Sequence, residues 1–488
     1  MNAPNLPKPE HHQAALVAAY VARTPGSKRL AAAARPVFAD KSSIGLRFDS
    51  ATKEACYPVV VERAAGAHLW DVDGHRYTDI LLGLGLNLFG HNPGFVRDAI
   101  TAELDRGFAL GVQHPLVGEL ARLVTSLTGT DRACFSTTGT EAVMTAVRIA
   151  RAATGRRCVA IFTNSYHGHH DSVLMRAPVA EYARKKALRA LENRPALRPL
   201  ASLLQALAGR GGLDRAVPAF AGVSAAAAQE VLVLDYASPR ALQVLAARAR
   251  EIAAVLVEPV QSRCPELQPQ AFLQQLRSLT QQAGMALIFD EMVTGFRVHP
   301  GGAQAHFGVQ ADLVTYSKVA GGGLPLSVVA GRSRWMDHID GGAWQFGDDS
   351  RPQVPTTFFA GTFTKHPLAL VAAHAVLSRL QAEGPALQLG LNARTAALVA
   401  GLNAHCSGRG LPLEFTHFGS FFAIAASRSR LPERARLLLA YQLLVRGVHL
   451  RIGDVGGFLS TAHGEAEVAH IHQAFTDSLD ALRADGLL

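Results

Sequence analysis

Short apolar runs alternate with amphipathic segments along the middle of the chain, from about residue 130 to residue 330. The runs have the length of buried strands, and residues with helical spacing follow several of them. This alternation predicts an α/β fold with a mainly parallel sheet covered by helices. The expected strands are RACF (132–135), RCVAIF (157–162), VLVL (231–234), AVLV (254–257), ALIF (286–289), LVTY (313–316) and LSVVA (326–330).

The two ends of the chain have a different pattern. The segment HLWDVDGHRYTDI (68–80) alternates on either side of Asp73-Gly74, which predicts a β-hairpin. Residues after about 362 predict helices with a few strands. We therefore expect an N-terminal arm over 1–55, the N-terminal part of a small domain over 56–110, a large ligand-binding domain over 111–361 and a C-terminal part of the small domain over 362–488.

Composition describes a well-packed globular protein, with 49% hydrophobic and 18% charged residues. No apolar run approaches the ~18–20 residues of a membrane span, and the N-terminus lacks a basic-then-apolar signal pattern. We therefore expect a cytoplasmic protein without a membrane partner. Five scattered cysteines without a C-x-x-C pair argue against a disulfide or zinc framework, namely Cys56, Cys134, Cys158, Cys264 and Cys406.

The net charge of +9 is unevenly placed. Residues 176–215 contain nine basic and three acidic residues, a local net charge of +6. Such a stretch is either a solvated helical face or a landing patch for an acidic partner. No DNA- or RNA-binding motif accompanies it, so we do not expect nucleic acid as the partner.

Polar residues follow the predicted strands at the points where these strands end. Glu258 and Asp290 each come directly after a strand, and Lys318 comes two residues after another. Thr138, Gly139 and Thr140 lie between the first of these strands and its helix. Because ligands of such sheets bind outside the carboxyl ends of the strands, we expect these groups to share one crevice.

Each group also has a simpler interpretation. The threonines can cap a helix, Asp290 can form an internal salt bridge, and Gly321–Gly323 after Lys318 can be an ordinary loop. Together they fit one ligand, pyridoxal 5′-phosphate. The helix start would hold its phosphate, the carboxylate its ring nitrogen and the lysine its aldehyde.

Several longer motifs contain these residues, and their order resembles the class III, fold-type I pyridoxal-phosphate aminotransferases, on the glutamate-1-semialdehyde aminomutase branch. The resemblance extends from about residue 57 to the C-terminus. The motifs are TTGTEAVMTAVRIAR (137–151), SYHGHHDS (165–172), VLVEPVQS (255–262), LIFDEMVTGFR (287–297), SKVAGGGLP (317–325) and FFAGTFTKHP (358–367).

The resemblance implies roles for the catalytic residues. Lys318 would form the Schiff base and move the substrate proton, and Asp290 would pair with the ring nitrogen. Tyr166 would stack on one face of the cofactor. Met292 would pack on the other face, where the family usually has valine.

The resemblance also implies further cofactor-binding residues. Thr138, Gly139 and Thr140 would bind phosphate, and Glu258 would lie near the cofactor hydroxyl. His167, next to Tyr166, would complete the set. Thr362 would reach the phosphate of a neighbouring subunit, which implies a homodimer.

A narrower resemblance concerns the aminotransferase domains of polyketide and nonribosomal peptide synthases. It includes LGLNLFGHNP (84–93), where Asn87 and Phe89 would line the substrate pocket. It implies transfer from an amino acid donor to a ketone or aldehyde, such as a β-ketoacyl thioester or a carrier-derived aldehyde of secondary metabolism. The basic stretch 176–215 would then suit an acyl carrier protein.

Other functions remain open at this point. Intramolecular transfer of the glutamate-1-semialdehyde aminomutase type and racemisation use the same scaffold, and a non-enzymatic ligand sensor is a further alternative. The histidines of HGHHD (167–171) suggest a metal, but no second ligand cluster accompanies them, so we expect no metal site. GLGLNLFG (83–90) departs from G-x-G-x-x-G, which disfavours a dinucleotide site.

Overall fold

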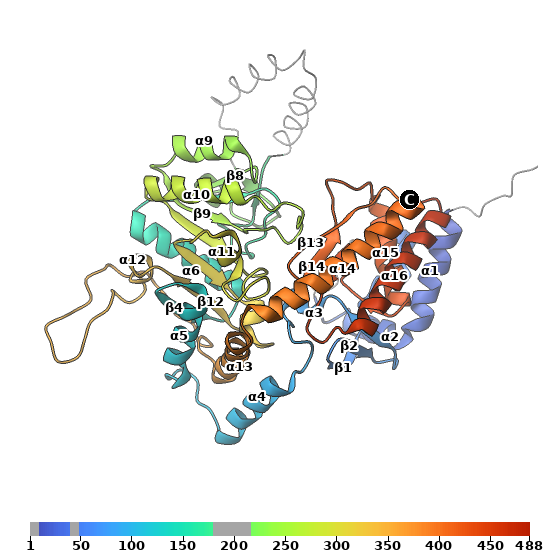
Figure 1. Cartoon of the computed structure of the whole chain (residues 1–488), viewed down its shortest axis with the longest axis horizontal. Coiled ribbons are helices and arrows are strands. Elements are labelled where there is room, and N and C mark those ends of the chain that lie inside the picture. The colour runs from blue at the N-terminus through green and yellow to red at the C-terminus, as the bar shows by residue number, and fades with distance from the viewer. Residues whose placement is uncertain (1–8, 40–47, 179–215) are drawn as a thin grey trace, which may run out of the picture.

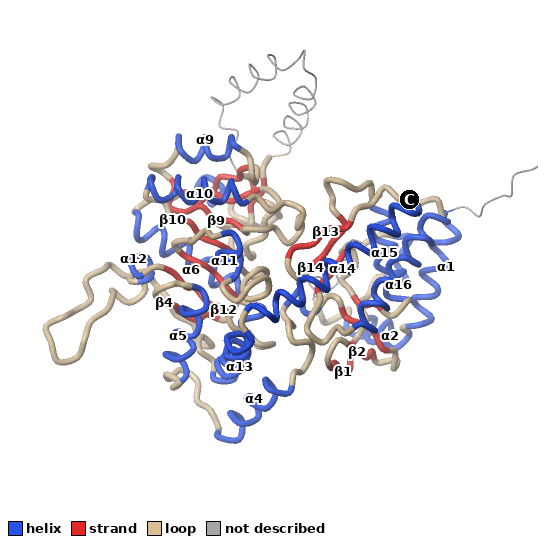
Figure 2. Tube along the Cα trace, in the orientation of Figure 1, coloured by secondary structure: helices blue, strands red, loops and turns tan. Residues whose placement is uncertain are grey.

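A computed structural model describes residues 9–39, 48–178 and 216–488, which form a large and a small lobe (Figure 1). The large lobe contains a twisted sheet with helices on both faces. The small lobe is built mainly from helices, and it joins the two ends of the chain (Figure 2).

The sheet of the large lobe has seven strands in the order β4-β12-β11-β10-β9-β5-β8. Neighbouring strands are parallel except at β12, which is antiparallel to both β11 and β4. The predicted mainly parallel sheet is therefore confirmed, and each expected strand is present. The strands are β4 (Arg132–Ser136), β5 (Cys158–Phe162), β8 (Val231–Leu234), β9 (Ile252–Val257), β10 (Ala286–Asp290), β11 (Leu313–Tyr316) and β12 (Ser327–Gly331).

Amphipathic helices cover the sheet because each presents an apolar stripe to it. In α6 (Gly139–Thr154), buried Val143, Ala146, Val147 and Ala150 form such a stripe. Ser238 precedes α9, but its side chain makes no capping hydrogen bond. The other large-lobe helices are α5 (Leu116–Thr128), α9 (Pro239–Ala247), α10 (Gln270–Ala283), α11 (Gly302–Phe307), α12 (Ser333–Met336) and α13 (Pro367–Glu383).

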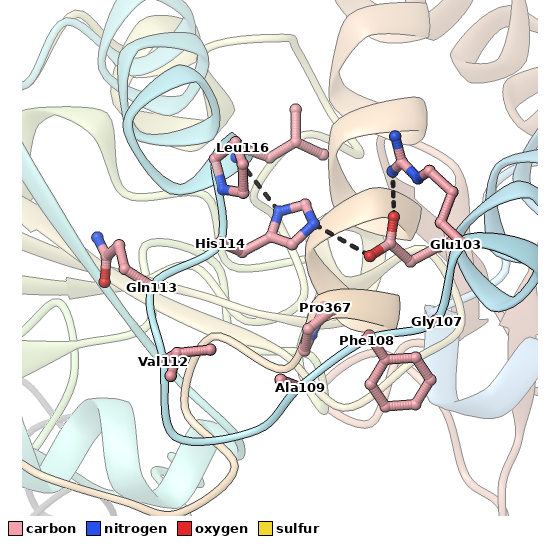
Figure 3. A pocket seen from close by; sticks show the side chains of 11 residues that line it. Glu103, Gly107, Phe108, Ala109, Val112, Gln113, His114, Leu116 and Pro367 are labelled. Carbon is pink, nitrogen blue, oxygen red and sulfur yellow. Dashed lines mark hydrogen bonds and ion pairs between the residues drawn. The ribbon is translucent and has the colours of Figure 1, made fainter.

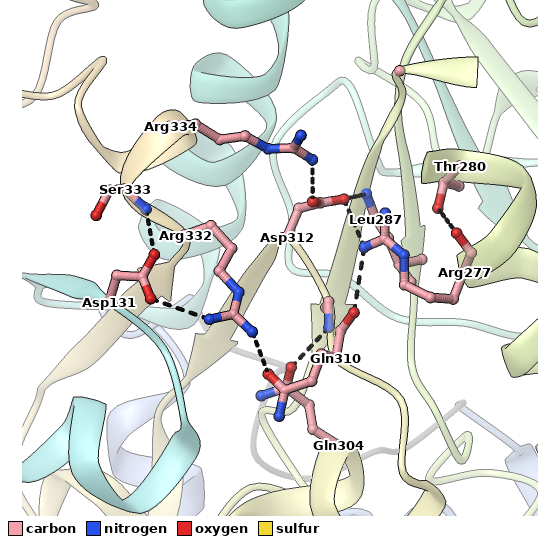
Figure 4. A network of polar contacts seen from close by, with 12 residues as sticks. Asp131, Arg277, Thr280, Leu287, Gln304, Gln310, Asp312, Arg332, Ser333 and Arg334 are labelled. Atoms are coloured by element: carbon pink, nitrogen blue, oxygen red, sulfur yellow. Dashed lines mark hydrogen bonds and ion pairs between the residues drawn. The ribbon is translucent and has the colours of Figure 1, made fainter. Parts of the chain in front are cut away.

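A polar network around Asp312 fixes the edge of the sheet at which the parallel strands begin (Figure 4). The buried Asp312 carboxylate accepts hydrogen bonds from Leu287 N, Arg277 Nη1 at 2.9 Å and Arg334 Nη2 at 2.7 Å. Its negative charge is therefore compensated by two guanidinium groups. This network belongs to the scaffold.

The small lobe contains a four-stranded sheet in the order β1-β2-β3-β15. The predicted hairpin is confirmed as β2 and β3, and β15 from the C-terminal segment pairs with β3 in parallel. This pairing joins the two chain ends in one lobe, although the exact domain boundaries stay a prediction. The strands are β1 (Val61–Ala65), β2 (His68–Asp71), β3 (Arg76–Asp79) and β15 (Val448–His449), with β13 (Phe415–Phe418), β14 (Phe421–Ile424) and β16 (Gly456–Phe458) in a second sheet.

Helices from both ends of the chain pack together in this lobe. Tyr20 of α1 contacts Tyr441 of α15, with ring centroids 5.2 Å apart. The expected N-terminal arm thus packs on the C-terminal segment. The helices outside the large lobe are α1 (Pro9–Arg23), α2 (Pro25–Ala34), α3 (Leu82–Gly85), α4 (Gly94–Arg106), α14 (Pro385–Arg409), α15 (Glu433–Val445) and α16 (Glu465–Ala484).

The structure also describes the cysteines and the apolar character of the helices. All five cysteines are free thiols. Within the three described ranges, no helix combines the length and the apolar character that crossing a bilayer requires.

Candidate active site

The carboxyl ends of three adjacent strands bring the predicted polar residues to one edge of the sheet. Asp290 is the last residue of β10, Glu258 follows β9, and Lys318 opens a short 3₁₀ turn, η4 (Lys318–Gly321), after β11. The arrangement follows from the parallel topology, since neighbouring parallel strands end on the same side.

Asp290 is buried and pairs with His167. Asp290 Oδ2 lies 2.7 Å from His167 Nδ1, and Asp290 Oδ1 accepts a hydrogen bond from Met292 N at 3.2 Å. Because an ionised carboxylate only accepts hydrogen bonds, the imidazole donates from Nδ1. Asp290 thus has an internal partner, as the simpler interpretation expects, but this partner is a histidine and, among the described residues, no lysine or arginine forms an ion pair with Asp290.

Glu258 is a second buried carboxylate of the site. Its Oε2 accepts a hydrogen bond from Tyr166 N at 3.0 Å, and its Oε1 lies 3.5 Å from Ser262 Oγ. Burial raises the pKa of the Glu258 carboxyl above its usual range, and Asp290 adds to this effect. Ser262 was not singled out from the sequence, although it ends a quoted motif.

Lys318 follows β11, the strand next to β10, and has an unusual backbone conformation. Its φ of 45° falls in the left-handed region, which is strained for a residue with a side chain. Burial lowers the pKa of the Lys318 amine below 10.5, while Asp290 and Glu258 act in the opposite direction. A lysine of lowered pKa at a strand end is typical of a nucleophile or a base.

One of the glycines after Lys318 is required by close packing. A Cβ on Gly322, whose φ is 60°, would lie 2.7 Å from the Ala372 carbonyl oxygen of α13. The close approach at this glycine is therefore made to a helix backbone, and it fixes the lysine-bearing turn on α13.

The start of α6 lies near the same edge of the sheet. Thr138 caps the helix, since its Oγ1 accepts from Glu141 N at 3.2 Å and its own N–H donates to Glu141 Oε2 at 3.1 Å. The capping interpretation thus holds for this hydroxyl. A Cβ on Gly139 would lie 3.0 Å from Met292 Sδ, so Gly139 and Met292 are neighbours. Thr140 Oγ1 lies 3.1 Å from His169 Nδ1.

Two buried polar atoms near these residues have no hydrogen-bond partner in the described part of the chain. They are His167 Nε2, beside Asp290, and Ser136 Oγ, at the end of β4. Buried polar groups normally have partners. With the free N–H groups at the start of α6, these atoms suit a polar, phosphate-bearing ring, so the residues present fit pyridoxal phosphate.

Two predicted residues are exposed. The Tyr166 side chain is 52% exposed, and the Arg263 guanidinium lies 6.0 Å from its ring centroid. Thr362 is also exposed, on the segment that leads into α13. Their roles toward a cofactor stay predictions.

The histidine motif forms no metal site among the described residues, where no group of three or more potential ligands comes together. Burial lowers the pKa of His170 to about 4, and Asp171 Oδ2 accepts from Ser224 N at 3.1 Å. Most of the basic stretch, residues 179–215, lies outside the described residues. The chain around it is joined at its base by the antiparallel pair β6 (Met175–Arg176) and β7 (Val217–Pro218).

One residue near the site was missed in the sequence. Arg297 ends the quoted motif LIFDEMVTGFR, and it is one of the largest fully buried side chains. Sequence patterns do not separate a buried arginine from an exposed one. The only signal was its position, a few residues after Asp290 on the same loop.

Comparison with known proteins identifies the family. A profile of the family described as Aminotransferase class-III matches residues 50–450. The chain belongs to the class-III aminotransferases. The predicted family and its fold-type I architecture are therefore confirmed, and the protein is a pyridoxal-phosphate-dependent enzyme.

Individual relatives cover nearly the whole chain. The glutamate-1-semialdehyde 2,1-aminomutase of Deinococcus radiodurans is 34% identical over 444 residues, which cover 87% of this chain and 91% of that protein. An omega-transaminase from Sphaerobacter thermophilus has a TM-score of 0.79 at 27% identity, covering 95% of this class-III chain and 99% of its own. A transaminase solved with PLP bound has a TM-score of 0.77 at 26% identity, with coverages of 95% and 99%.

Proposed function

We propose that this enzyme transfers an amino group from an amino acid donor to a separate ketone or aldehyde. The observation that carries the proposal is Lys318, a buried lysine of lowered pKa that follows β11 and interacts electrostatically with the Asp290 and Glu258 carboxylates. The neutral form of a lysine, which a lowered pKa favours, can attack a carbonyl carbon and accept a proton.

Pyridoxal phosphate supplies an aldehyde for the amino group and a ring that withdraws electrons from the reacting carbon. The residues of this chain would hold it in the way that the sequence indicates. Asp290 binds the ring nitrogen, and His167 orients the Asp290 carboxylate. The N-terminus of α6, with Gly139 and Thr140, binds the phosphate. Tyr166 and Met292 border the ring faces, and Glu258 lies on the hydroxyl side.

Lys318 carries the proton transfer. Once its amine is free, it takes the proton from the substrate Cα and returns it at the other reacting carbon. The Asp290 and Glu258 carboxylates favour the protonated amine after it has accepted the proton. Asp290 contributes electrostatically, since a fixed negative charge stabilises positive charge on a ring nitrogen during the reaction.

Support for a separate acceptor comes from the segment that follows the site motif SYHGHHDS. β6 and β7 pair with each other, and the sequence between them forms a long segment that is rich in arginine. A basic segment of this kind suits an acidic carrier or its phosphorylated arm. We therefore propose a β-ketoacyl thioester or a carrier-derived aldehyde of secondary metabolism as the acceptor.

Intramolecular amino transfer is the second candidate function. It is favoured by the aminomutase relatives, which share about a third of their residues with this chain. Residues that hold the cofactor serve both reactions, so the acceptor decides between them.

The test is a single turnover of protein loaded with pyridoxamine phosphate in the absence of an amino acid donor. A panel of free aldehydes, β-keto thioesters and glutamate-1-semialdehyde is added, and the products are measured by mass spectrometry. We expect one amine per site from an aldehyde or a β-keto thioester. Isomerisation of glutamate-1-semialdehyde alone, over many turnovers, would support the aminomutase function and contradict our proposal.

We also propose that two copies of the chain form the active unit. The loop between α4 and α5 exposes Phe108 and Val112 beside a hollow of about 450 Å³ (Figure 3). Phe358 and Phe363, which flank Thr362, are 74% and 54% exposed. These apolar groups need a cover, and a second copy would bring Thr362 to the neighbouring site.

A further inference from the structure

Arg297 is buried without a negative partner. Its guanidinium is fully buried, and none of the carboxylates in the described ranges forms an ion pair with it. Desolvation lowers the pKa of Arg297 to about 9. A buried charge without a counter-ion is costly, so its retention needs another reason.

The hydrogen bonds of Arg297 connect three segments that are far apart in the sequence. Nη2 donates to Gly85 O at 2.5 Å, and Nη1 donates to Ser420 Oγ at 2.7 Å and to Leu459 O at 3.0 Å. The guanidinium also lies 5.1 Å from the ring centroid of Phe458. All these partners belong to the small lobe or to the loop that leads from it.

The segment that carries Arg297 begins at the end of β10. Phe296 O accepts from Gln388 Nε2 at 2.8 Å, and Val298 O accepts from Asn392 Nδ2 at 3.2 Å, both on α14. The backbone on both sides of Arg297 is therefore fixed. Asp290 is the last residue of β10, and Arg297 lies on the loop that follows it. A short stretch of backbone therefore connects Arg297 to the cofactor site.

The loop held by Arg297 is the one in which we expect the substrate pocket. We call residues 80–91 the pocket loop. Its turn α3 packs against η4, the turn that begins at Lys318. The turn is strained, since Leu82 and Leu84 have φ values of 48° and 63°. Gly85 approaches Phe458 closely, where a Cβ would lie 2.6 Å from the ring. A strained loop keeps its shape only when its surroundings fix it.

We propose that Arg297 is a positioning residue that holds the pocket loop against the Lys318 turn and thereby sets the substrate pocket. The inference rests on the proposed role of Lys318. Arginine suits this task because its planar fork presents several donors in fixed directions. Its positive charge also favours the neutral form of Lys318, whose pKa it lowers.

The test compares Arg297→Met, Arg297→Lys and Ser420→Ala by hydrogen exchange of backbone amides and by steady-state kinetics. Exchange is measured on cofactor-free protein without substrate. We expect amides of the pocket loop in Arg297→Met to exchange at least about tenfold faster, while those of β9 and β10 stay protected. KM for the carbonyl acceptor should rise more than kcat falls. Arg297→Lys should recover part of the effect.

Arg156→Met is the matched control. Arg156 Nη1 also donates to three backbone carbonyls, those of Ile252, Ala283 and Gly284, but these lie in the large lobe away from the pocket loop. This variant should leave KM and pocket-loop exchange unchanged. If Arg297→Met does not fold, Ser420→Ala decides, because it removes one acceptor and keeps the charge.

Unchanged pocket-loop exchange in the folded Arg297 variants, or in Ser420→Ala where those do not fold, would overturn the inference. A wild-type protein that transfers no amino group would instead contradict the proposed function. The two failures are distinguishable, since exchange is measured without turnover.

Discussion

His167 Nδ1 donates a hydrogen bond of 2.7 Å to Asp290 Oδ2, and both side chains are buried at the end of β10. The pair comes from segments far apart in the sequence, which the sheet brings together. Both oxygens of the Asp290 carboxylate are therefore fixed before a ligand binds, one by the His167 imidazole and the other by Met292 N. Such preorganisation is what electrostatic catalysis requires.

Replacing Asp290 by Asn should lower kcat by roughly 10²–10³-fold, because the charge opposite the ring nitrogen is lost. The cofactor should still bind in part, since phosphate and lysine contacts remain. Cofactor content and single-turnover rates measure the two effects separately. His167→Ala should lower the rate less than Asp290→Asn does. A near-normal rate in Asp290→Asn would mean that another group holds the ring.

Lys318→Ala should abolish turnover and the visible absorbance of the protein loaded with pyridoxal phosphate. The reason is that no other amine would form a covalent bond with the aldehyde. Reduction with borohydride followed by peptide mapping gives an independent measurement, with label expected only on the Lys318 peptide of the wild type. Retention of a reducible bond in the variant would contradict the assignment.

The lowered pKa of Lys318 also predicts a pH dependence. The amine acts as a base in its neutral form, so the rate should rise with pH through its pKa. Because burial lowers that pKa, the rise should occur well below pH 10.5. The single-turnover rate of proton transfer from a deuterated donor, measured against pH, checks this. A rate that keeps rising to pH 10.5 would mean that the amine is not desolvated in the working enzyme.

Most of the sheet and the site could be predicted because they depend on local sequence. Strands such as β9 and β10 are continuous apolar runs, and parallel topology alone places Asp290 and Glu258 at one edge. The roles of Arg297 and Asp79 could not be predicted. Arg297 donates to Ser420 and Leu459, and Asp79 pairs with His449. Each of these partners is more than a hundred residues away in the sequence. Only tertiary packing decides which polar residue becomes buried there.

Asp79 should make the stability of the protein sensitive to acid. Its buried carboxylate accepts from Leu81 N and Leu82 N, and lies 2.8 Å from His91 Nε2 and from His449 Nδ1. Desolvation raises the pKa of Asp79, but the two histidines outweigh it, and the net shift is well below the usual range.

A carboxyl group whose pKa is lower in the folded state stabilises the fold above its unfolded pKa, and this contribution is lost as pH falls. Asp79→Asn should therefore lower Tm at pH 7, by the equivalent of about 2–4 kcal/mol for a broken buried network. The difference from wild type should shrink as the pH falls below the unfolded pKa of 3.8. Scanning calorimetry at several pH values checks the trend, and a constant difference would contradict it.

Charge reversal in the basic stretch tests the carrier hypothesis. Changing Arg184, Lys185 and Lys186 to Glu should raise KM for a carrier-bound acceptor by about tenfold or more at low salt. The rate with a small free aldehyde should stay unchanged, which makes the free substrate the internal control. If the charge-reversed variant had the same KM as the wild type for the carrier-bound acceptor, this segment would be excluded as the docking site.

Mixed dimers test whether Thr362 acts at the site of a second copy. Lys318→Ala and Thr362→Ala should each lower activity strongly, because one removes the amine and the other a phosphate contact. If Thr362 acts across the interface, a mixed dimer contains one site with both defects and one intact site. Coexpression of differently tagged copies should then restore about half of the wild-type rate per dimer. If Thr362 acts within its own chain, both sites keep one defect and the mixed dimer stays inactive, which would contradict the shared site.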